Sequence, residues 1–153
     1  MRSIAIVLVL AACGSGDDGG SDAAVLFPAD YAASFVEVRD CRVSGDHELD
    51  QIIVKTDPGA AQAYQLRDRA FETGAIVLKE ERDPSDSTCT TDIIKWTVMV
   101  RLPTGSSPGT LDWKWQKVDA NRKVLEEDEP LCIGCHQTCG VPPDGYLGTC
   151  ALP

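Results

Sequence analysis

The feature that most constrains the fold is the stretch IIKWTVMVRLP at residues 93–103, where apolar and polar side chains alternate. This period of two is typical of a β-strand, whose successive side chains point to opposite faces. One face would carry the apolar side chains of Ile94, Trp96, Val98, Val100 and Leu102. The other face would carry those of Lys95, Thr97, Met99 and Arg101. A turn-rich segment and the stretch LDWKWQKVD, with Trp113 and Trp115 on one face, follow at once, so the sequence predicts an antiparallel pair of strands.

The segments before this pair predict further strands and short helices. Residues 48–56 and 74–81 (GAIVLKEE) have the composition of strands, and residues 57–71 indicate a turn that leads into a short helix. Tyr31, Phe35 and Val38 recur at helical spacing behind a proline, which suits the start of another short helix. The sequence therefore predicts an α+β fold with an antiparallel sheet and short flanking helices. The 126 residues from 28 to 153 suffice for one domain.

The N-terminus predicts export and a lipid anchor. Arg2 precedes an apolar run over residues 4–10, which is too short to span a bilayer but long enough for an export signal. The run ends in LAAC, which resembles a bacterial lipobox, so we expect a signal peptide at residues 1–12 and a lipid on Cys13. Residues 13–27 would form a flexible tether that holds the extracytoplasmic domain at a bacterial membrane, with the outer membrane favoured. The alternative is an ordinary cleaved signal in which Cys13 is incidental.

Charge narrows the expected partners. Once Arg2 leaves with the signal, 13 basic residues stand against 24 acidic ones, a formal net charge of −11. A surface of that sign repels phosphate backbones, which argues against nucleic acid as a partner. A basic redox partner protein fits this charge, and so does the simpler interpretation that the acidic surface only keeps the protein soluble.

The seven cysteines divide into three groups. Cys13 belongs to the lipid anchor, and two cysteines belong to a motif near the C-terminus. In an oxidising compartment the other four suggest two disulfides, for which three connectivities exist. These four are Cys41, Cys89, Cys139 and Cys150. We favour Cys41–Cys89 and Cys139–Cys150, because the second pair closes a short loop rich in glycine and proline.

The motif is Cys132-Ile133-Gly134-Cys135-His136, which has the attachment signature of c-type haem. Two thiols at this spacing reach two vinyl groups on one edge of the porphyrin, and the adjacent histidine then lies beneath the iron as the proximal ligand. Haem is attached outside the cytoplasm, which agrees with the export signal. One covalent haem per chain is therefore the expected cofactor.

Three alternatives for the motif stay open. A structural zinc site needs four ligands, and beyond the motif the chain offers only Cys139 nearby and one distant histidine, His47. A redox-active dithiol normally precedes a helix in a βαβ setting near the start of a domain. Structural sulfur without a cofactor is the third alternative.

No strong protein ligand is evident for the second axial position of such a haem. Only 17 residues follow His136, none of them a methionine, and Met99 is the only methionine left after the signal is removed. An open face favours a small-molecule ligand or substrate over a permanently six-coordinate electron carrier.

A strand-rich haem domain with a C-terminal C-x-x-C-H motif resembles the cytochrome P-460 and cytochrome c′-beta family. The similarity covers most of residues 28–150. PADYAASFVEV is similar to the family's first helix, and GAIVLKEE to its strand Gly-x-hydrophobic-hydrophobic-x-Lys-Glu. KWTVMVRLP resembles the central aromatic strand, and CIGCHQTC with the later DGYLGTC resembles the haem-binding end.

In cytochrome P-460 the lysine of that strand is bonded to a haem meso carbon, and the enzyme oxidises hydroxylamine. The matching position here is Lys79, at the end of an apolar run. The resemblance thus implies redox chemistry on a small nitrogen compound such as hydroxylamine. If Lys79 faces a porphyrin edge, its amine loses hydration and keeps a larger neutral, nucleophilic fraction. From the residues alone, Lys79 is equally well a solvated strand-end lysine beside Glu80 and Glu81.

Other functions stay open beside this enzymatic one. Cytochrome c′-beta, the branch with an unmodified haem, implies a nitric-oxide-binding or electron-transfer protein. Without haem, the chain would be a structural lipoprotein held by disulfides.

Two further positions bear on the resemblance. The cross-linked enzymes of the family carry an arginine in the strand that matches ELDQIIVK, where this chain has Asp50 and Gln51. His47 lies just before that strand, where many relatives carry a histidine, and the resemblance makes it a distal or second-shell group of the haem. The sequence itself also allows a surface loop histidine there, which is the commoner case.

Overall fold

The computed structural model describes residues 23–45, 47–140 and 148–150. The predicted signal peptide, Cys13 and most of the predicted tether lie outside these residues. Within the described ranges, no helix is both long enough and apolar enough to cross a membrane.

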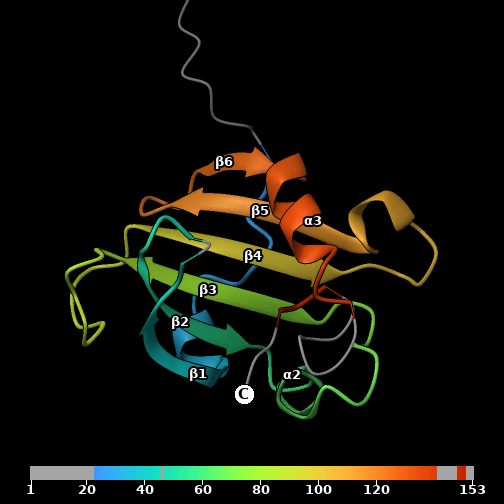
Figure 1. The fold of residues 1–153 in the computed structure, drawn as a ribbon, viewed down its shortest axis with the longest axis horizontal. Coiled ribbons are helices and arrows are strands. Elements are labelled where there is room, and N and C mark those ends of the chain that lie inside the picture. The colour runs from blue at the N-terminus through green and yellow to red at the C-terminus, as the bar shows by residue number, and fades with distance from the viewer. Residues whose placement is uncertain (1–22, 46, 141–147, 151–153) are drawn as a thin grey trace, which may run out of the picture.

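In the described part of the chain, six strands form one antiparallel sheet, and strands that are adjacent along the chain are also adjacent in space (Figure 1). They are β1 (Val36–Val43), β2 (Gln51–Thr56), β3 (Ile76–Arg82), β4 (Lys95–Arg101), β5 (Trp113–Asp119) and β6 (Val124–Glu127). The predicted pairing of β4 with β5 is confirmed, with Met99 opposite Trp115. The α+β fold with an antiparallel sheet is therefore confirmed.

Short helices flank the sheet. They are α1 (Tyr31–Ser34), α2 (Ala61–Leu66), a 3-10 helix (Pro108–Thr110) and α3 (Pro130–His136). Figure 1 shows α3 crossing in front of β4 and β5. Side chains of α2 and α3 join the core on that face of the sheet, whereas Tyr31 of α1 joins the core on the opposite face.

The alternation along the strands builds these two cores. On the α3 side, Val77, Met99, Trp113 and Trp115 are buried together with Ile133 of α3. The opposite face buries a second set that includes apolar residues from before β1. Its members are Phe27, Tyr31, Leu78, Trp96, Val98, Val118 and Val124. A strand buried on both faces in this way offers few positions to solvent, which makes polar residues on it informative.

Near the N-terminus the structure differs from the sequence-based expectation. The helix predicted from Tyr31, Phe35 and Val38 ends at Ser34, because the chain from Val36 onward pairs with β2 instead. Residues 23–27, assigned to the tether, pack on the sheet: Phe27 is buried, and the Leu26 amide donates to Gln116 Oε1 at 3.0 Å. The packed domain thus begins before residue 28.

Among the described residues two disulfides are present, and they are the pairs that the sequence favoured. Cys41–Cys89 joins β1 to the connection between β3 and β4, and Cys139–Cys150 closes the segment that follows α3. Cys132 and Cys135 are free thiols.

Candidate functional site

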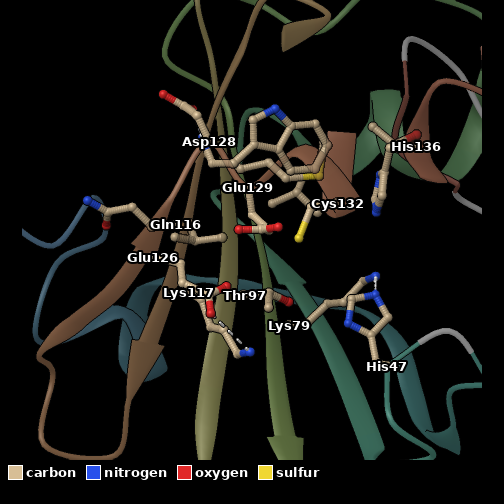
Figure 2. A pocket seen from close by; sticks show the side chains of 15 residues that line it. His47, Lys79, Thr97, Gln116, Lys117, Glu126, Asp128, Glu129, Cys132 and His136 are labelled. Atoms are coloured by element: carbon tan, nitrogen blue, oxygen red, sulfur yellow. Dashed lines mark hydrogen bonds and ion pairs between the residues drawn. The ribbon is translucent and has the colours of Figure 1, made fainter. Parts of the chain in front are cut away.

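A pocket lies between α3 and the sheet face formed by β3, β4 and β5 (Figure 2). The space between these walls is about 510 Å³, and part of it is open solvent. Val77, Met99 and Trp115 supply apolar wall, and His136 and Cys132 approach from α3. Lys79 and His47 line the same pocket, so the structure brings together four of the residues singled out from the sequence.

The helix α3 presents the motif. Pro130 occupies the first turn, where its missing N–H costs nothing, and the Glu129 side chain accepts from the Leu131 amide. Cys132 and His136 are four residues apart and share one face of the helix, the face that lines the pocket. Cys135, which immediately precedes His136, is exposed.

The His136 ring is held in one orientation. It is 6% exposed, and it meets Trp115 edge to face with ring centroids 4.8 Å apart. Its Nδ1 is hydrogen-bonded to the carbonyl oxygen of Gly148. Because a carbonyl only accepts, Nδ1 carries the proton and Nε2 carries the lone pair. Burial, with the charge of Lys79 next in size, lowers the pKa of His136 to about 4, so the ring is neutral at pH 7.

The position of the Gly148 carbonyl depends on glycine and on a disulfide. Gly148 has φ +79°, and a Cβ there would lie 2.9 Å from Leu111 Cδ1. The Gly148 amide donates to the Cys139 carbonyl at 3.2 Å, and the Cys139 amide donates to the His136 carbonyl at 3.1 Å. The Cys139–Cys150 disulfide thus closes the segment that orients His136. Gly148 lies in the stretch DGYLGTC, but no sequence pattern marks it as part of the site.

Lys79 and His47 meet on the wall of the pocket that β3 provides. The Lys79 amine is hydrogen-bonded to His47 Nε2 (Figure 2). On the other side of the ring, His47 Nδ1 lies 3.4 Å from Glu81 Oε1. His47 lies in the turn before β2, and its side chain is 18% exposed. Lys79 is half-buried within β3, which continues to Arg82, and its neighbours Glu80 and Glu81 are 2% and 1% exposed.

Asp50 and Gln51 lie away from the pocket lining. Asp50 is buried and forms an ion pair with Lys95 at 2.8 Å, and the Gln51 amide donates to the Pro84 carbonyl at 3.1 Å. These contacts give both residues a role in holding the loop before β2 and the connection after β3.

Two observations bear on the dithiol and zinc alternatives for the motif. Burial, followed by the charges of Glu129 and Glu126, raises the pKa of the Cys132 thiol, which is opposite to the low pKa of redox-active dithiols. Among the residues that the structure describes, no three His, Cys, Asp or Glu side chains are grouped so that they could hold a metal ion.

No protein-family model matches the chain, and no curated protein matches its sequence.

Proposed function

We propose that this chain is a c-type haem protein in which Cys132 and Cys135 form the thioether bonds and His136 is the proximal ligand. The observation that carries the proposal is the state of His136, whose Nδ1 is bonded to the Gly148 carbonyl while Nε2 keeps its lone pair. Histidines that bind a metal through one nitrogen commonly donate the other N–H to a backbone carbonyl, which fixes the tautomer and the ring.

The surroundings of His136 fit a haem in three ways. Cys132 and Cys135 are the two cysteines left as free thiols in the described chain, while four others form disulfides. Cys132 shares a helix face with His136, and the pocket beneath it has apolar walls from Val77, Met99 and Trp115. When bound, a haem would supply an iron that binds a small molecule and exchanges electrons with it.

For the reaction, we propose redox chemistry on a small nitrogen compound such as hydroxylamine, in an extracytoplasmic domain anchored through Cys13. The similarity to cytochrome P-460 supports this substrate class, as does the place of Lys79 on the pocket wall. Lys79 can donate to a polar ligand, and Thr97 and Lys117 add polar atoms beside it. A redox partner protein would have to be basic to match the acidic surface.

A second candidate function rests on Met99. Its side chain lines the same pocket, and thioether sulfur is an axial ligand in many electron-transfer haem proteins. A methionine ligand would fill the second axial position, so this observation favours the electron-transfer function over binding of nitric oxide. Met99→Leu separates the two, because leucine conserves volume and removes the sulfur. An unchanged absorption spectrum in this variant excludes Met99 as a ligand.

The proposal is tested by co-expression of the exported chain with a haem-attachment system, followed by intact mass measurement. We expect a coloured protein that is one haem heavier than its polypeptide. Cys132→Ala with Cys135→Ala should remove that mass, whereas the matched pair Cys41→Ala with Cys89→Ala should keep it. A colourless wild-type protein, with zinc or with a Cys132–Cys135 disulfide, would overturn the proposal. Turnover of hydroxylamine with an artificial electron acceptor then separates the enzyme from a gas-binding protein.

A further inference from the structure

Three polar side chains form a connected row on the β3 side of the pocket. Lys79 and Glu81 are two residues apart on β3, so both point to the pocket face of the sheet. His47, from the loop before β2, lies between their side chains: Nε2 contacts the Lys79 amine, and Nδ1 lies 3.4 Å from Glu81. Glu81 is further fixed by the Thr97 hydroxyl, which donates to Oε1 at 2.7 Å, and by Lys95 at 3.5 Å.

The direction of the hydrogen bonds follows from Glu81. Burial opposes ionisation of this carboxyl, but hydrogen bonds from His47 and Thr97, together with Lys95, outweigh it and hold the pKa of Glu81 below its usual range. An ionised carboxylate only accepts, so Nδ1 of His47 carries the proton. His47 Nε2 is then an acceptor, and the amine of Lys79 donates to it. Lys79, His47 and Glu81 are therefore placed side by side in the order of a nucleophile, a base and a group that orients the base.

We propose that His47 is the general base for the Lys79 amine, that Glu81 positions His47, and that Lys79 is a nucleophile toward small carbon electrophiles that enter the pocket. The electrophiles of this class are carbonyl compounds and isocyanic acid. The inference does not depend on haem attachment, because the contacts that carry it lie within the chain. In this proposal His47 acts on the Lys79 amine, whereas the family resemblance makes His47 a distal group of the haem.

The step with isocyanic acid is balanced without an oxidant. The Lys79 ammonium first loses one proton to solvent, and the step starts from the neutral amine. Its lone pair attacks the electrophilic carbon, a nitrogen–carbon bond forms, and the electrons of the carbon–nitrogen π bond move to the nitrogen of the reagent. The proton leaves Lys79 for His47 Nε2 and then passes to that nitrogen, while Glu81 stabilises the transient imidazolium. The product is a substituted urea, and no group leaves.

The test is competitive carbamylation of the full mature chain by a limiting amount of cyanate at pH 7, with peptide masses giving the rate at each lysine. Lys117 is the internal reference, because it lines the same pocket and pairs instead with Glu126 at 3.9 Å. General-base catalysis typically contributes about 100-fold or more, so we expect Lys79 to react at least about ten-fold faster than Lys117. Equal or slower reaction of Lys79 in the wild-type protein would overturn the inference.

Three variants identify the cause. His47→Gln keeps an acceptor but cannot take a proton, and it should bring Lys79 down to the rate of Lys117. Glu81→Gln should slow Lys79 several-fold. Glu80→Gln is the matched control, because Glu80 is equally buried but faces the other side of the sheet, toward Tyr31, and it should leave the ratio unchanged. The proposal would be contradicted if His47→Gln left the ratio of the Lys79 rate to the Lys117 rate unchanged. It would also be contradicted if Glu80→Gln lowered this ratio as much as His47→Gln does. The assay is run on chains prepared with and without haem. If the protein is colourless but Lys79 reacts faster than Lys117, the haem proposal is wrong and the proposal for Lys79 stands.

Discussion

The substitution Gly148→Ala tests whether the segment after α3 positions His136. At φ +79° an L-residue is strained, and the added Cβ would lie 2.9 Å from Leu111 Cδ1. The backbone conformation costs roughly 1–2 kcal/mol and displacement of the Leu111 side chain roughly 0.5–1.5 kcal/mol, which together lower the free energy of unfolding by about 1.5–3.5 kcal/mol. If the segment shifts to escape this strain, the Gly148 carbonyl moves away from His136 and the hydrogen bond is lost.

The assay is urea unfolding of the disulfide-intact protein, combined with measurement of haem content and of the absorption spectrum. Gly140→Ala is the control, because a Cβ there has its nearest neighbour, the Gln137 carbonyl oxygen, at an ordinary 3.9 Å. We expect Gly140→Ala to be nearly neutral, and Gly148→Ala to be destabilised with less haem or an altered spectrum. Equal stability and identical spectra in the two variants would refute the argument that Gly148 holds the ligand.

Four further predictions follow from the sequence and the structure. In the haem-free chain the pKa of His136 falls from 6.5 to about 4 on folding. His136 therefore contributes about 3 kcal/mol to the free energy of unfolding above pH 6.5, and this contribution is lost as the pH falls toward 4. In urea unfolding at a series of pH values, His136→Gln should lack this part of the pH dependence. Cys41→Ala with Cys89→Ala opens a link across 48 residues and should cost about 4 kcal/mol in the same assay. Cys13→Ala should abolish incorporation of labelled fatty acid, and retained label would exclude the lipobox. Lys79→Ala should shift the haem spectrum and abolish any hydroxylamine oxidation while the haem stays attached, whereas an identical spectrum favours the gas-binding function.

Much of the sheet could be predicted because its central strands have a clear period of two. The alternation in residues 94–102 and the two tryptophans of β5 identified both strands and their pairing. The helix over residues 31–38 was predicted too long, since three apolar residues at helical spacing carry less weight than the ladder that β1 forms with β2. The strand β6 covers only four residues, too few for a periodic signal.

The site residues could be predicted where a motif has a chemical reason for its spacing. They could not be predicted where the conformation of a loop determines the position of the side chain. Glu81 could have been found, because strand geometry puts it on the same face as Lys79. The position of His47 could not, since the loop that carries it passes through Glu48 and Leu49, both with positive φ, and periodicity says nothing about such a turn. The role of Gly148 depends on a backbone carbonyl, which has no sequence signal of its own.

The most direct test of the central claim is the reduced absorption spectrum in alkaline pyridine of the wild-type protein made with a haem-attachment system. This treatment replaces the axial ligands, so the band positions report only how the porphyrin is bound. The account predicts one haem per chain with the spectrum of a porphyrin whose two vinyl groups are both converted to thioethers, and haem that stays with the peptide containing Cys132 and Cys135 after acid extraction. Haem that is extracted into the solvent, or a protein that shows no haem bands, would contradict it.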